Sequence, residues 1–419
     1  MDLVLKNCKL INKNGQYHIK VKDGKISDIS KQPLKGDNII DIKDNYVLSG
    51  FIDPHIHFRD PGLTQKEDFK SGSESAANGG FTTVIDMPNT IPKTNTYKAL
   101  KEKINIAKSK SIVNFELQAE PNDLKEMEKM MELNPIAFKV FMDLKTDEEL
   151  NEIFKNLSQL KDKTDYNGLI ATHCEKKSIV ESETKRLKEK TENNAIDYTY
   201  ARPVKSEDES VKQAINLAKE NNLKLHICHL SSSKSLEMAK NESNNMNISW
   251  EFTPHHLLLD NQAYNKYGTL IKTNPPLREK QDSVRISDLD ETSIIGTDHA
   301  PHTLDDKNKG VWNSSPGIPN LETVVPLLLT EVNKGNISLE LIPKILSENA
   351  AKVYNLKNKG RIDIGYDGDF TVIDLKQKGT FNIDEFKTKA EYSPFDGWNY
   401  CGKAVMTIVK GKIVMNEIN

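Results

Sequence analysis

Eight short apolar segments, separated by longer amphipathic ones, fill the middle of this chain of 419 residues. The apolar segments are rich in Val, Ile and Phe, which predicts buried strands. They cover residues 46–52, 81–85, 113–117, 136–141, 169–172, 223–228, 248–252 and 294–296. Helical patterns separate most of them, among them 97–109, 147–160 and 207–220, and a further one follows at 321–333. This alternation indicates an α/β fold, a (β/α)8 TIM barrel, with its functional groups at the carboxyl ends of the strands.

The two ends of the chain have a different pattern, in which short strands follow one another with tight turns between them. Strand-like stretches lie at 3–5, 18–21, 25–29 and 39–42 near the N-terminus, and at 360–364, 369–373, 404–409 and 412–414 near the C-terminus. We therefore expect one small β-sandwich domain, made of residues 1–48 and 355–419, beside a barrel of residues 49–354.

Charge and hydropathy exclude several classes of partner. The 58 basic and 61 acidic residues leave a net charge of −3, which does not favour nucleic acid. No apolar run approaches the 18 or so residues that cross a membrane, and Met1-Asp-Leu-Val does not begin a signal peptide. Four cysteines stand far apart, as is typical of a reducing compartment. We expect a cytoplasmic protein with a small-molecule substrate.

The first barrel strand ends in a pair of histidines, His55 and His57. Residues two apart on a strand point to the same face, so the two imidazoles project together. Such a pair is either a packed structural feature or half of a metal site, because neutral imidazole is the commonest metal ligand. Arg59 follows on the same face, where a fixed cation suits an anionic substrate group.

Ionisable residues recur at the ends of the other strands: Lys139, His173, His229 and Asp298. Each alone could be purely structural, but in a barrel all of them meet at one mouth. Nitrogen and oxygen ligands without thiolate fit a hydrolytic Zn²⁺ site. A lysine is unexpected among them, since cations would repel it. Reaction with CO₂ gives a carbamate, an anion that can bridge two metals.

The remaining polar residues near these positions have weaker signals. His226 faces the other side of its strand, Cys174 and Cys228 fit inert core thiols, and His255 and His256 fit supporting roles. The polar stretch 303–318 is a long loop beside the site, which is typical of a lid or substrate clamp.

Two long motifs carry a resemblance to a known family. The segments 53–61, Asp-Pro-His-Ile-His-Phe-Arg-Asp-Pro, and 296–307, beginning Gly-Thr-Asp-His-Ala-Pro-His, resemble the signatures of the dihydroorotase branch of the amidohydrolase superfamily. The similarity extends across essentially the whole chain, including residues 86–90, 253–257, 273–278, 316–322 and 393–397.

The resemblance implies a reaction and a set of roles. The reaction is reversible ring closure of N-carbamoyl-L-aspartate to L-dihydroorotate, a step of pyrimidine (UMP) biosynthesis. Two Zn²⁺ ions per subunit would be bridged by carboxylated Lys139, one bound by His55, His57 and Asp298 and the other by His173 and His229. Asp298 would also be the catalytic acid/base. Substrate would contact Arg59, Asn89, Asn274, His302, Pro316 and Gly317. A homodimer is implied, as is an association with aspartate transcarbamoylase.

Alternatives stay open at several positions. Some relatives have Asp in place of Lys139, and Asp143 is a second candidate carboxylate. Asn320 stands where relatives often have Gly, which could alter loop closure. Hydantoinases and allantoinases share the His-x-His pair and the lysine strand, but Arg59 favours a substrate with a carboxylate. A catalytically silent scaffold is disfavoured because every ligand position is filled.

Overall fold

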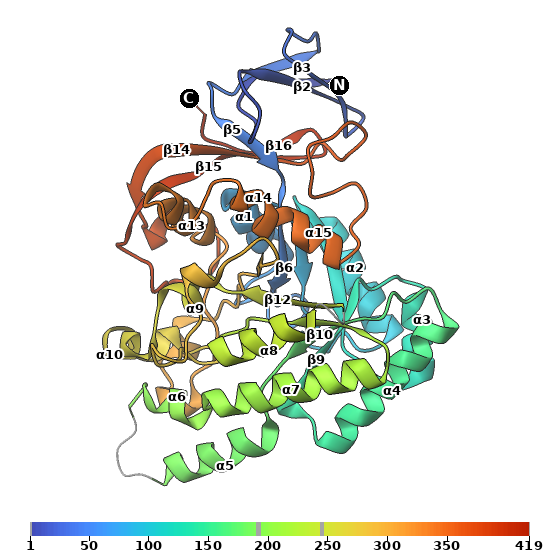
Figure 1. The fold of residues 1–419 in the computed structure, drawn as a ribbon, viewed down its shortest axis with the longest axis vertical. Helices are drawn as coiled ribbons and strands as arrows, with labels where there is room; N and C mark the ends of the chain where they lie inside the picture. Colours follow the sequence, from blue (N-terminus) through green and yellow to red (C-terminus); the bar gives the residue numbers. More distant parts are fainter. Residues whose placement is uncertain (1, 190–193, 244–246, 419) are drawn as a thin grey trace.

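The computed structural model describes residues 2–189, 194–243 and 247–418. A barrel of parallel strands forms the body of the molecule, and sheets from the two chain ends lie together at one side of it (Figure 1). The predicted α/β barrel with a separate β domain is therefore confirmed.

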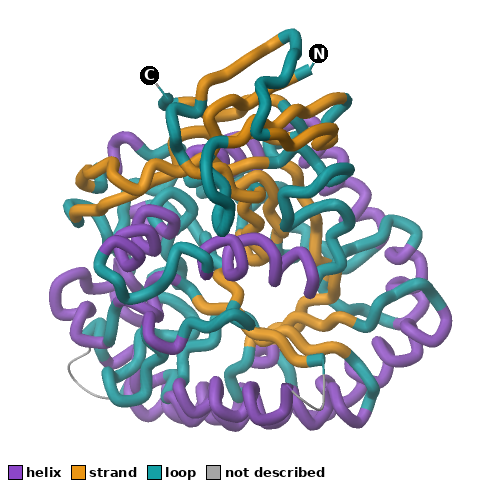
Figure 2. The backbone as a smooth tube through the Cα atoms, turned by 45° about the horizontal axis from the view of Figure 1, so that its top comes forward, coloured by secondary structure: helices purple, strands orange, loops and turns teal. Residues whose placement is uncertain are grey.

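The barrel has eight strands in chain order, each parallel to its neighbours. They are β6 (Phe51–Ile56), β7 (Phe81–Asp86), β8 (Asn114–Ala119), β9 (Ala137–Phe141), β10 (Leu169–His173), β11 (Lys224–Ile227), β12 (Ile248–Phe252) and β13 (Ile294–Ile295). The first and last meet through the residues that follow them, since Ile56 forms a bridge with His299 and the His57 N–H donates to the His299 carbonyl at 2.8 Å. Figure 2 shows the ring of strands inside its helices.

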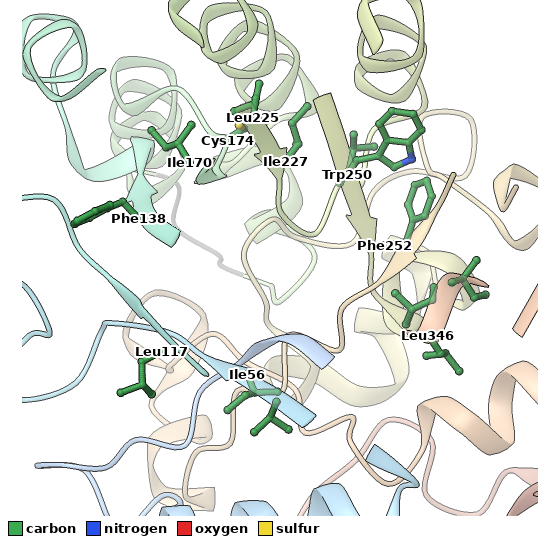
Figure 3. Packing of buried hydrophobic residues seen from close by; sticks show 14 of the residues in the cluster. Ile56, Leu117, Phe138, Ile170, Cys174, Leu225, Ile227, Trp250, Phe252 and Leu346 are labelled. Carbon is green, nitrogen blue, oxygen red and sulfur yellow. The ribbon is translucent and has the colours of Figure 1, made fainter. Parts of the chain in front are cut away.

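Amphipathic helices cover the outside of the ring. The longer ones are α1 (Phe69–Asn78), α2 (Tyr97–Lys110), α3 (Leu124–Met131), α4 (Asp147–Lys163), α5 (Lys177–Lys188), α7 (Val204–Glu220), α8 (Ser233–Ser243) and α13 (Val324–Asn333). Strand side chains such as Phe138, Ile170 and Leu225 point outward into a core shared with these helices (Figure 3). Burying each such side chain stabilises the fold by roughly 1.5–3 kcal/mol. No helix among the described residues is long and apolar enough to cross a membrane.

The amino ends of the strands are closed by a second apolar cluster. Ile52, Ile85 and Leu169 pack there against Tyr354, which follows α15 (Asn349–Val353) and is fully buried. With this end filled, the carboxyl ends of the strands form the open mouth of the barrel, as in other barrels of this type.

Two four-stranded sheets form the β domain. One has the order β3-β2-β1-β4 and the other β16-β15-β14-β5. Their strands are β1 (Leu3–Cys8), β2 (Tyr17–Lys22), β3 (Lys25–Ser30), β4 (Asn38–Asp41), β5 (Tyr46–Ser49), β14 (Phe370–Thr380), β15 (Asn399–Val409) and β16 (Lys412–Asn416). Leu5 and Ile19 of the first sheet share a core with Val47, Val372 and Met406 of the second, so the sheets pack face to face.

Two strand predictions were wrong in detail. The apolar run 46–52 is not one strand, because β5 pairs with β14 whereas β6 joins the barrel. Gly50 lies between them, packed so closely that a Cβ there would be 2.2 Å from Thr82 Oγ1. The segment 360–364 forms no strand: it lies between Gly360 and Gly365, both with positive φ, which turn the chain away from a ladder.

A segment of the β domain, residues 387–392, reaches back to the barrel, and we call it the C-terminal strap. The backbone N–H of Lys387 donates to both carboxylate oxygens of Glu322 at 2.9 Å. The Thr388 hydroxyl donates to Glu67 at 2.5 Å, and the Tyr392 hydroxyl donates to the carbonyl of Gly317 at 2.9 Å. Both carboxylates are buried, so the strap is fixed against the mouth of the barrel.

Candidate active site

Four predicted ligand histidines meet at the mouth of the barrel. Their ring centroids follow one another at 5.3 Å from His57 to His55, 5.1 Å from His55 to His229, and 4.7 Å from His229 to His173. The four residues end or follow β6, β10 and β11, and all are buried. Separate strand ends therefore bring these imidazoles together as the sequence predicts.

Outer partners fix the tautomers of the first two histidines. The Nδ1 atom of His55 contacts the carboxylate of Glu251, and Nδ1 of His57 lies 2.7 Å from Oδ1 of Asn89. Both partners are acceptors, so each histidine has its proton on Nδ1 and a lone pair on Nε2. These Nε2 atoms lie 3.4 Å (His55) and 3.0 Å (His57) from Oδ1 of Asp298.

Of the other two histidines, His173 repeats this pattern with the ring nitrogens exchanged. The Nε2 atom of His173 lies 2.8 Å from the carboxylate of Glu175, so its lone pair is on Nδ1. That Nδ1 lies 3.0 Å from Nε2 of His229. The remaining nitrogen of His229, Nδ1, is buried without a hydrogen-bond partner among the described residues.

The unprotonated nitrogens and a carboxylate oxygen thus face a common centre. Burial lowers the pKa of His57 to about 4, although Asp298 works against this, so the imidazole is neutral at physiological pH. Burial likewise lowers the pKa of His229 well below its usual value, and the neighbouring His173 adds to the effect. Lone pairs that converge without protons between them are the donor set of a bound cation.

Lys139 lies beside this centre on β9, opposite Ala171 of β10. Its side chain is fully buried, and its amino group has no hydrogen-bond partner among the described residues. Burying an ammonium without a counter-charge is costly, so this position fits a lysine whose charge is removed or reversed. The alternative carboxylate, Asp143, is already paired, because its Oδ2 accepts from Arg202 at 2.7 Å.

Arg59, His229 and Asp298 have a left-handed backbone, with φ of 61°, 37° and 47°. Residues with a Cβ rarely adopt this conformation, and it costs on the order of 1–3 kcal/mol. Such residues persist only where the surrounding structure fixes the chain, and all three of these stand at or just after a barrel strand, among the predicted site residues.

A second cluster of predicted site residues forms around His302. Its Nε2 atom lies 3.0 Å from Nη2 of Arg59 and 3.0 Å from the carbonyl of Pro316. Arg59 is buried, and its Nε donates to the carbonyl of Pro301 at 3.3 Å. Arg59 therefore binds neutral groups and keeps its charge available for an anion.

Gly317 and Asn274 lie on adjoining segments at the edge of this cluster. The Gly317 N–H donates to the carbonyl of Lys272 at 2.8 Å, and a Cβ on Gly317 would be 2.2 Å from the carbonyl oxygen of Ala300. Asn274 does not contact the histidines; its Oδ1 accepts from the Tyr198 hydroxyl at 2.7 Å.

The loop 303–318 contains two short helices, α11 (Leu304–Lys307) and α12 (Gly310–Asn313), and is fastened by two lysines. The amino group of Lys307 donates to three carbonyls, of Lys272, Ser315 and Gly317, at 2.9–3.1 Å. Lys272 donates back to the carbonyls of Val311 and Ser314 at 2.7 and 2.6 Å. The loop is therefore held against the site.

Sequence reasoning missed the partners that orient the histidines. Glu251 also accepts from His226, at 3.0 Å, and an acid inside the apolar stretch 248–252 was a usable signal. Glu175 stands two residues after His173, on the same face of the extended chain. Asn320, expected to affect the loop, is instead buried and donates to His255 Nδ1 and the Thr297 carbonyl, both at 2.9 Å.

Comparison with known proteins gives consistent results. The model of the amidohydrolase family matches residues 46–414. The dihydroorotase of Methanosphaera stadtmanae is 45% identical, covering 99% of this chain and 97% of its own, and that of Methanothermobacter thermautotrophicus is 44% identical, covering 99% and 94%. Among solved structures, an L-hydantoinase (dihydropyrimidinase) from Arthrobacter aurescens superimposes with a TM-score of 0.92 at 31% identity, covering 99% of this chain and 96% of its own.

Proposed function

The chain belongs to the amidohydrolase family, and we propose that it catalyses the dihydroorotase reaction, the reversible cyclisation of N-carbamoyl-L-aspartate to L-dihydroorotate in pyrimidine biosynthesis. The relatives of 44–45% identity over almost the whole chain support this activity. The structural observation that carries it is the position of Arg59, which forms no ion pair among the described residues, two residues after His57 and thus beside the four convergent imidazoles. A hydrolytic centre and a carboxylate-binding group share one mouth.

The donor set fits two Zn²⁺ ions. His55, His57 and Asp298 would hold one, and His173 and His229 the other, because these residues present their lone pairs in two groups. Lys139, as its carbamate, would supply the bridging anion that its unpartnered buried nitrogen lacks. When bound, the ions lower the pKa of a water and polarise the amide carbonyl.

The residues of the chain then divide the remaining work. Arg59 and His302 hold the substrate carboxylate, which fixes the ring with its cyclic amide towards Asp298. In ring opening, water attacks the amide carbonyl, and Asp298 accepts its proton. The carbon–nitrogen bond breaks as Asp298 donates that proton to the departing ring nitrogen. Ring closure reverses these steps and releases water.

Asp298 is suited to this task by its surroundings. Its Oδ1 faces the unprotonated Nε2 atoms of His57, at 3.0 Å, and His55, at 3.4 Å, and an aspartate carboxyl is ionised at neutral pH. It is therefore ionised and ready to accept a proton, as a base must be. It stands just after β13 with a left-handed backbone, and its carboxylate faces the two histidines.

Hydantoinase activity is the second candidate, favoured by the fold of the L-hydantoinase structure and by an L-hydantoinase of Paenarthrobacter aurescens that is 32% identical. A hydantoin ring lacks the carboxylate of dihydroorotate, and Arg59 would face it without a counter-charge. A charge-assisted contact is worth roughly 1.5–3 kcal/mol, about one to two orders of magnitude in affinity. A silent scaffold is disfavoured because all the ligand residues are present.

The test is ring opening of L-dihydroorotate, hydantoin and allantoin in parallel, by zinc-loaded protein supplied with bicarbonate. We expect turnover of dihydroorotate far above that of the other two rings. Turnover of the neutral rings instead would contradict the proposed substrate but leave the proposed metal centre unchanged. Absence of any turnover in protein shown to hold zinc would favour the scaffold.

We also propose that the enzyme is a cytoplasmic homodimer that associates with aspartate transcarbamoylase, the enzyme that supplies its substrate. Light scattering of the purified protein, alone and mixed with that transcarbamoylase, tests both points. A monomer that elutes apart from the second protein would contradict them without affecting the proposed activity.

A further inference from the structure

Lys66, which follows the His-x-His strand, lies against the far side of the His302 ring. Its Nζ is 3.0 Å from Nδ1 of His302 and 2.9 Å from Oδ2 of Asp306. The side chain is 13% exposed, so the ammonium is largely removed from water. An ammonium in such a place has a role beyond solubility, because its burial must be offset by specific contacts.

These contacts determine where His302 carries its proton. An ammonium can only donate, so Nδ1 of His302 is the acceptor from Lys66. The proton of the neutral imidazole is then on Nε2, which lies 3.0 Å from the Pro316 carbonyl, a group that can only accept. These two contacts, made on opposite sides of the ring, are both satisfied by the same tautomer, whereas the third contact, between Nε2 and Nη2 of Arg59, is not.

With this tautomer, the third contact of the His302 ring, to Arg59, has no acceptor. Nη2 of Arg59 lies 3.0 Å from Nε2 of His302, so two N–H donors stand side by side. An acceptor with two oxygens resolves this arrangement, because a carboxylate can accept a proton from Arg59 and share the Nε2 proton of His302 with the Pro316 carbonyl. The burial of His302, followed by the charges of Arg59, Lys66 and Lys307, lowers its pKa far below the usual value and keeps the ring neutral.

We propose that Lys66, whose own charge is paired with Asp306, is a specificity-determining residue: it fixes His302 as an Nε2–H donor beside Arg59, and this pair of donors selects anionic rings over neutral ones. This inference rests on the proposed function for the identity of the anion. Lys66 acts through His302 and is therefore a positioning residue, not a catalytic one.

The first experiment measures binding without chemistry. Orotate has the ring and the carboxylate of the substrate, and uracil has the ring alone. Titration calorimetry on the zinc-loaded protein compares both ligands in wild type, Lys66→Met and Lys66→Gln. We expect Lys66→Met to weaken orotate about tenfold or more and uracil by less than about twofold. Lys66→Gln keeps an N–H donor without the charge and should fall between.

Lys309 provides the matched control. It also pairs with Asp306, at 2.8 Å, but its side chain is 53% exposed and it does not contact His302. Lys309→Met therefore removes a lysine from the same carboxylate without changing the tautomer, and should leave orotate affinity within about twofold of wild type. Equal losses in the Lys66 and Lys309 variants would overturn the proposal.

A spectroscopic measurement separates positioning from simple loss of packing. Histidine nitrogens with and without a proton differ clearly in their ¹⁵N shifts, and the signals of His302 are assigned by their disappearance in His302→Gln. We expect the Nδ1 atom of His302 to be unprotonated in wild type. In Lys66→Met we expect a mixture of the two tautomers, with the proton partly on Nδ1 and partly on Nε2. A protonated Nδ1 in wild type contradicts the inference.

The two levels of proposal fail differently. A protein that binds orotate through Lys66 but does not open dihydroorotate keeps this inference and loses the proposed function. A protein that opens dihydroorotate with an unchanged KM in Lys66→Met keeps the function and loses the inference. Wild type that binds no orotate also overturns the inference.

Discussion

The Nε2 atom of His57 lies 3.0 Å from Oδ1 of Asp298, with no proton to share between them. The proton of His57 is on the opposite nitrogen, directed to Asn89 at 2.7 Å. One oxygen of Asp298, Oδ1, therefore faces the lone pairs of both His55 and His57. The two roles proposed for Asp298, metal binding and proton transfer, can therefore be tested separately.

Replacing Asp298 with Asn should keep most of the metal and abolish turnover. The amide oxygen can still face the cation, but it cannot accept and return a proton, and loss of a general base lowers the rate by about 10²–10⁴-fold. Metal analysis and kcat for dihydroorotate are measured on the same sample. A variant with metal and near-normal kcat would show that another group transfers the proton.

Lys139→Ala should lose at least one of two metal ions, since it removes the proposed bridging anion. Short carboxylic acids added to this variant should restore part of the activity by occupying the vacated space. Elemental analysis before and after dialysis against a chelator gives the metal content. Full metal occupancy in Lys139→Ala would indicate that Asp143 supplies the bridging anion. Asp143→Asn is the control that distinguishes the Asp143 carboxylate from the Lys139 carbamate.

Arg59→Met should raise KM for dihydroorotate by about one to two orders of magnitude, because a buried charge-assisted contact is lost. Metal content should not change, since the Arg59 side chain donates to the Pro301 carbonyl and contacts His302, which is not among the proposed metal ligands. Dihydrouracil, the same ring without a carboxylate, is the control substrate. An unchanged KM for dihydroorotate would show that the substrate carboxylate is bound by another part of the site.

Protonation of the Glu175 carboxylate should make the protein less stable against unfolding at acid pH. Burial works against its ionisation, but Arg202 and His173 outweigh burial and bring its pKa to about 2. Because this value lies below that of the unfolded chain, the stabilisation is complete above about pH 4.5 and is lost as the pH falls towards 2. Its size is on the order of 3 kcal/mol.

Calorimetric melting temperatures between pH 2 and 6 check this prediction with Glu175→Gln. The variant should melt lower at neutral pH, since Arg202 loses a partner, and its melting temperature should depend less on pH below 4.5. Glu183→Gln is the control, because Glu183 pairs with Arg186 on the surface of α5 and should change little. Parallel pH profiles of wild type and Glu175→Gln would contradict the assignment.

Tyr392→Phe should weaken the attachment of the loop at Gly317 to the C-terminal strap without unfolding the β domain. It removes one neutral hydrogen bond, worth about 1 kcal/mol, while the Lys307 contact at 2.9 Å is kept. KM for dihydroorotate should rise several-fold with little change in melting temperature. Tyr366→Phe, in the β domain, serves as the comparison; an equal effect in both variants would exclude a specific role for the strap.

The barrel could be predicted from the sequence because its strands are continuous apolar runs buried on both faces. The positions of His55, His173, His229 and Asp298 followed, since the ends of parallel strands in a closed ring must meet. The assignment of their roles stays a prediction. Lys139 was also visible, because an ammonium inside an apolar strand is costly unless its charge is paired or removed.

What could not be predicted depends on contacts between distant segments. Glu251 reaches His55 across the barrel, and Lys66 reaches His302 from a distant part of the chain, so neither contact leaves a local pattern. The run 46–52 kept its apolar character although Gly50 divides it between two sheets. A local apolar pattern predicts that a segment is buried, but it does not predict which sheet the segment joins.

The C-terminal strap has a consequence for the order of events during synthesis. A ribosome completes all eight barrel strands, with every histidine and Asp298, well before it reaches Tyr392. Until then Glu67 and Glu322 lack their partners in the strap, and the carbonyl of Gly317 lacks the Tyr392 hydroxyl. The nascent chain therefore has its chemical groups early, whereas the contacts of the strap with the barrel and with Gly317 form only after residues 387–392 have been made.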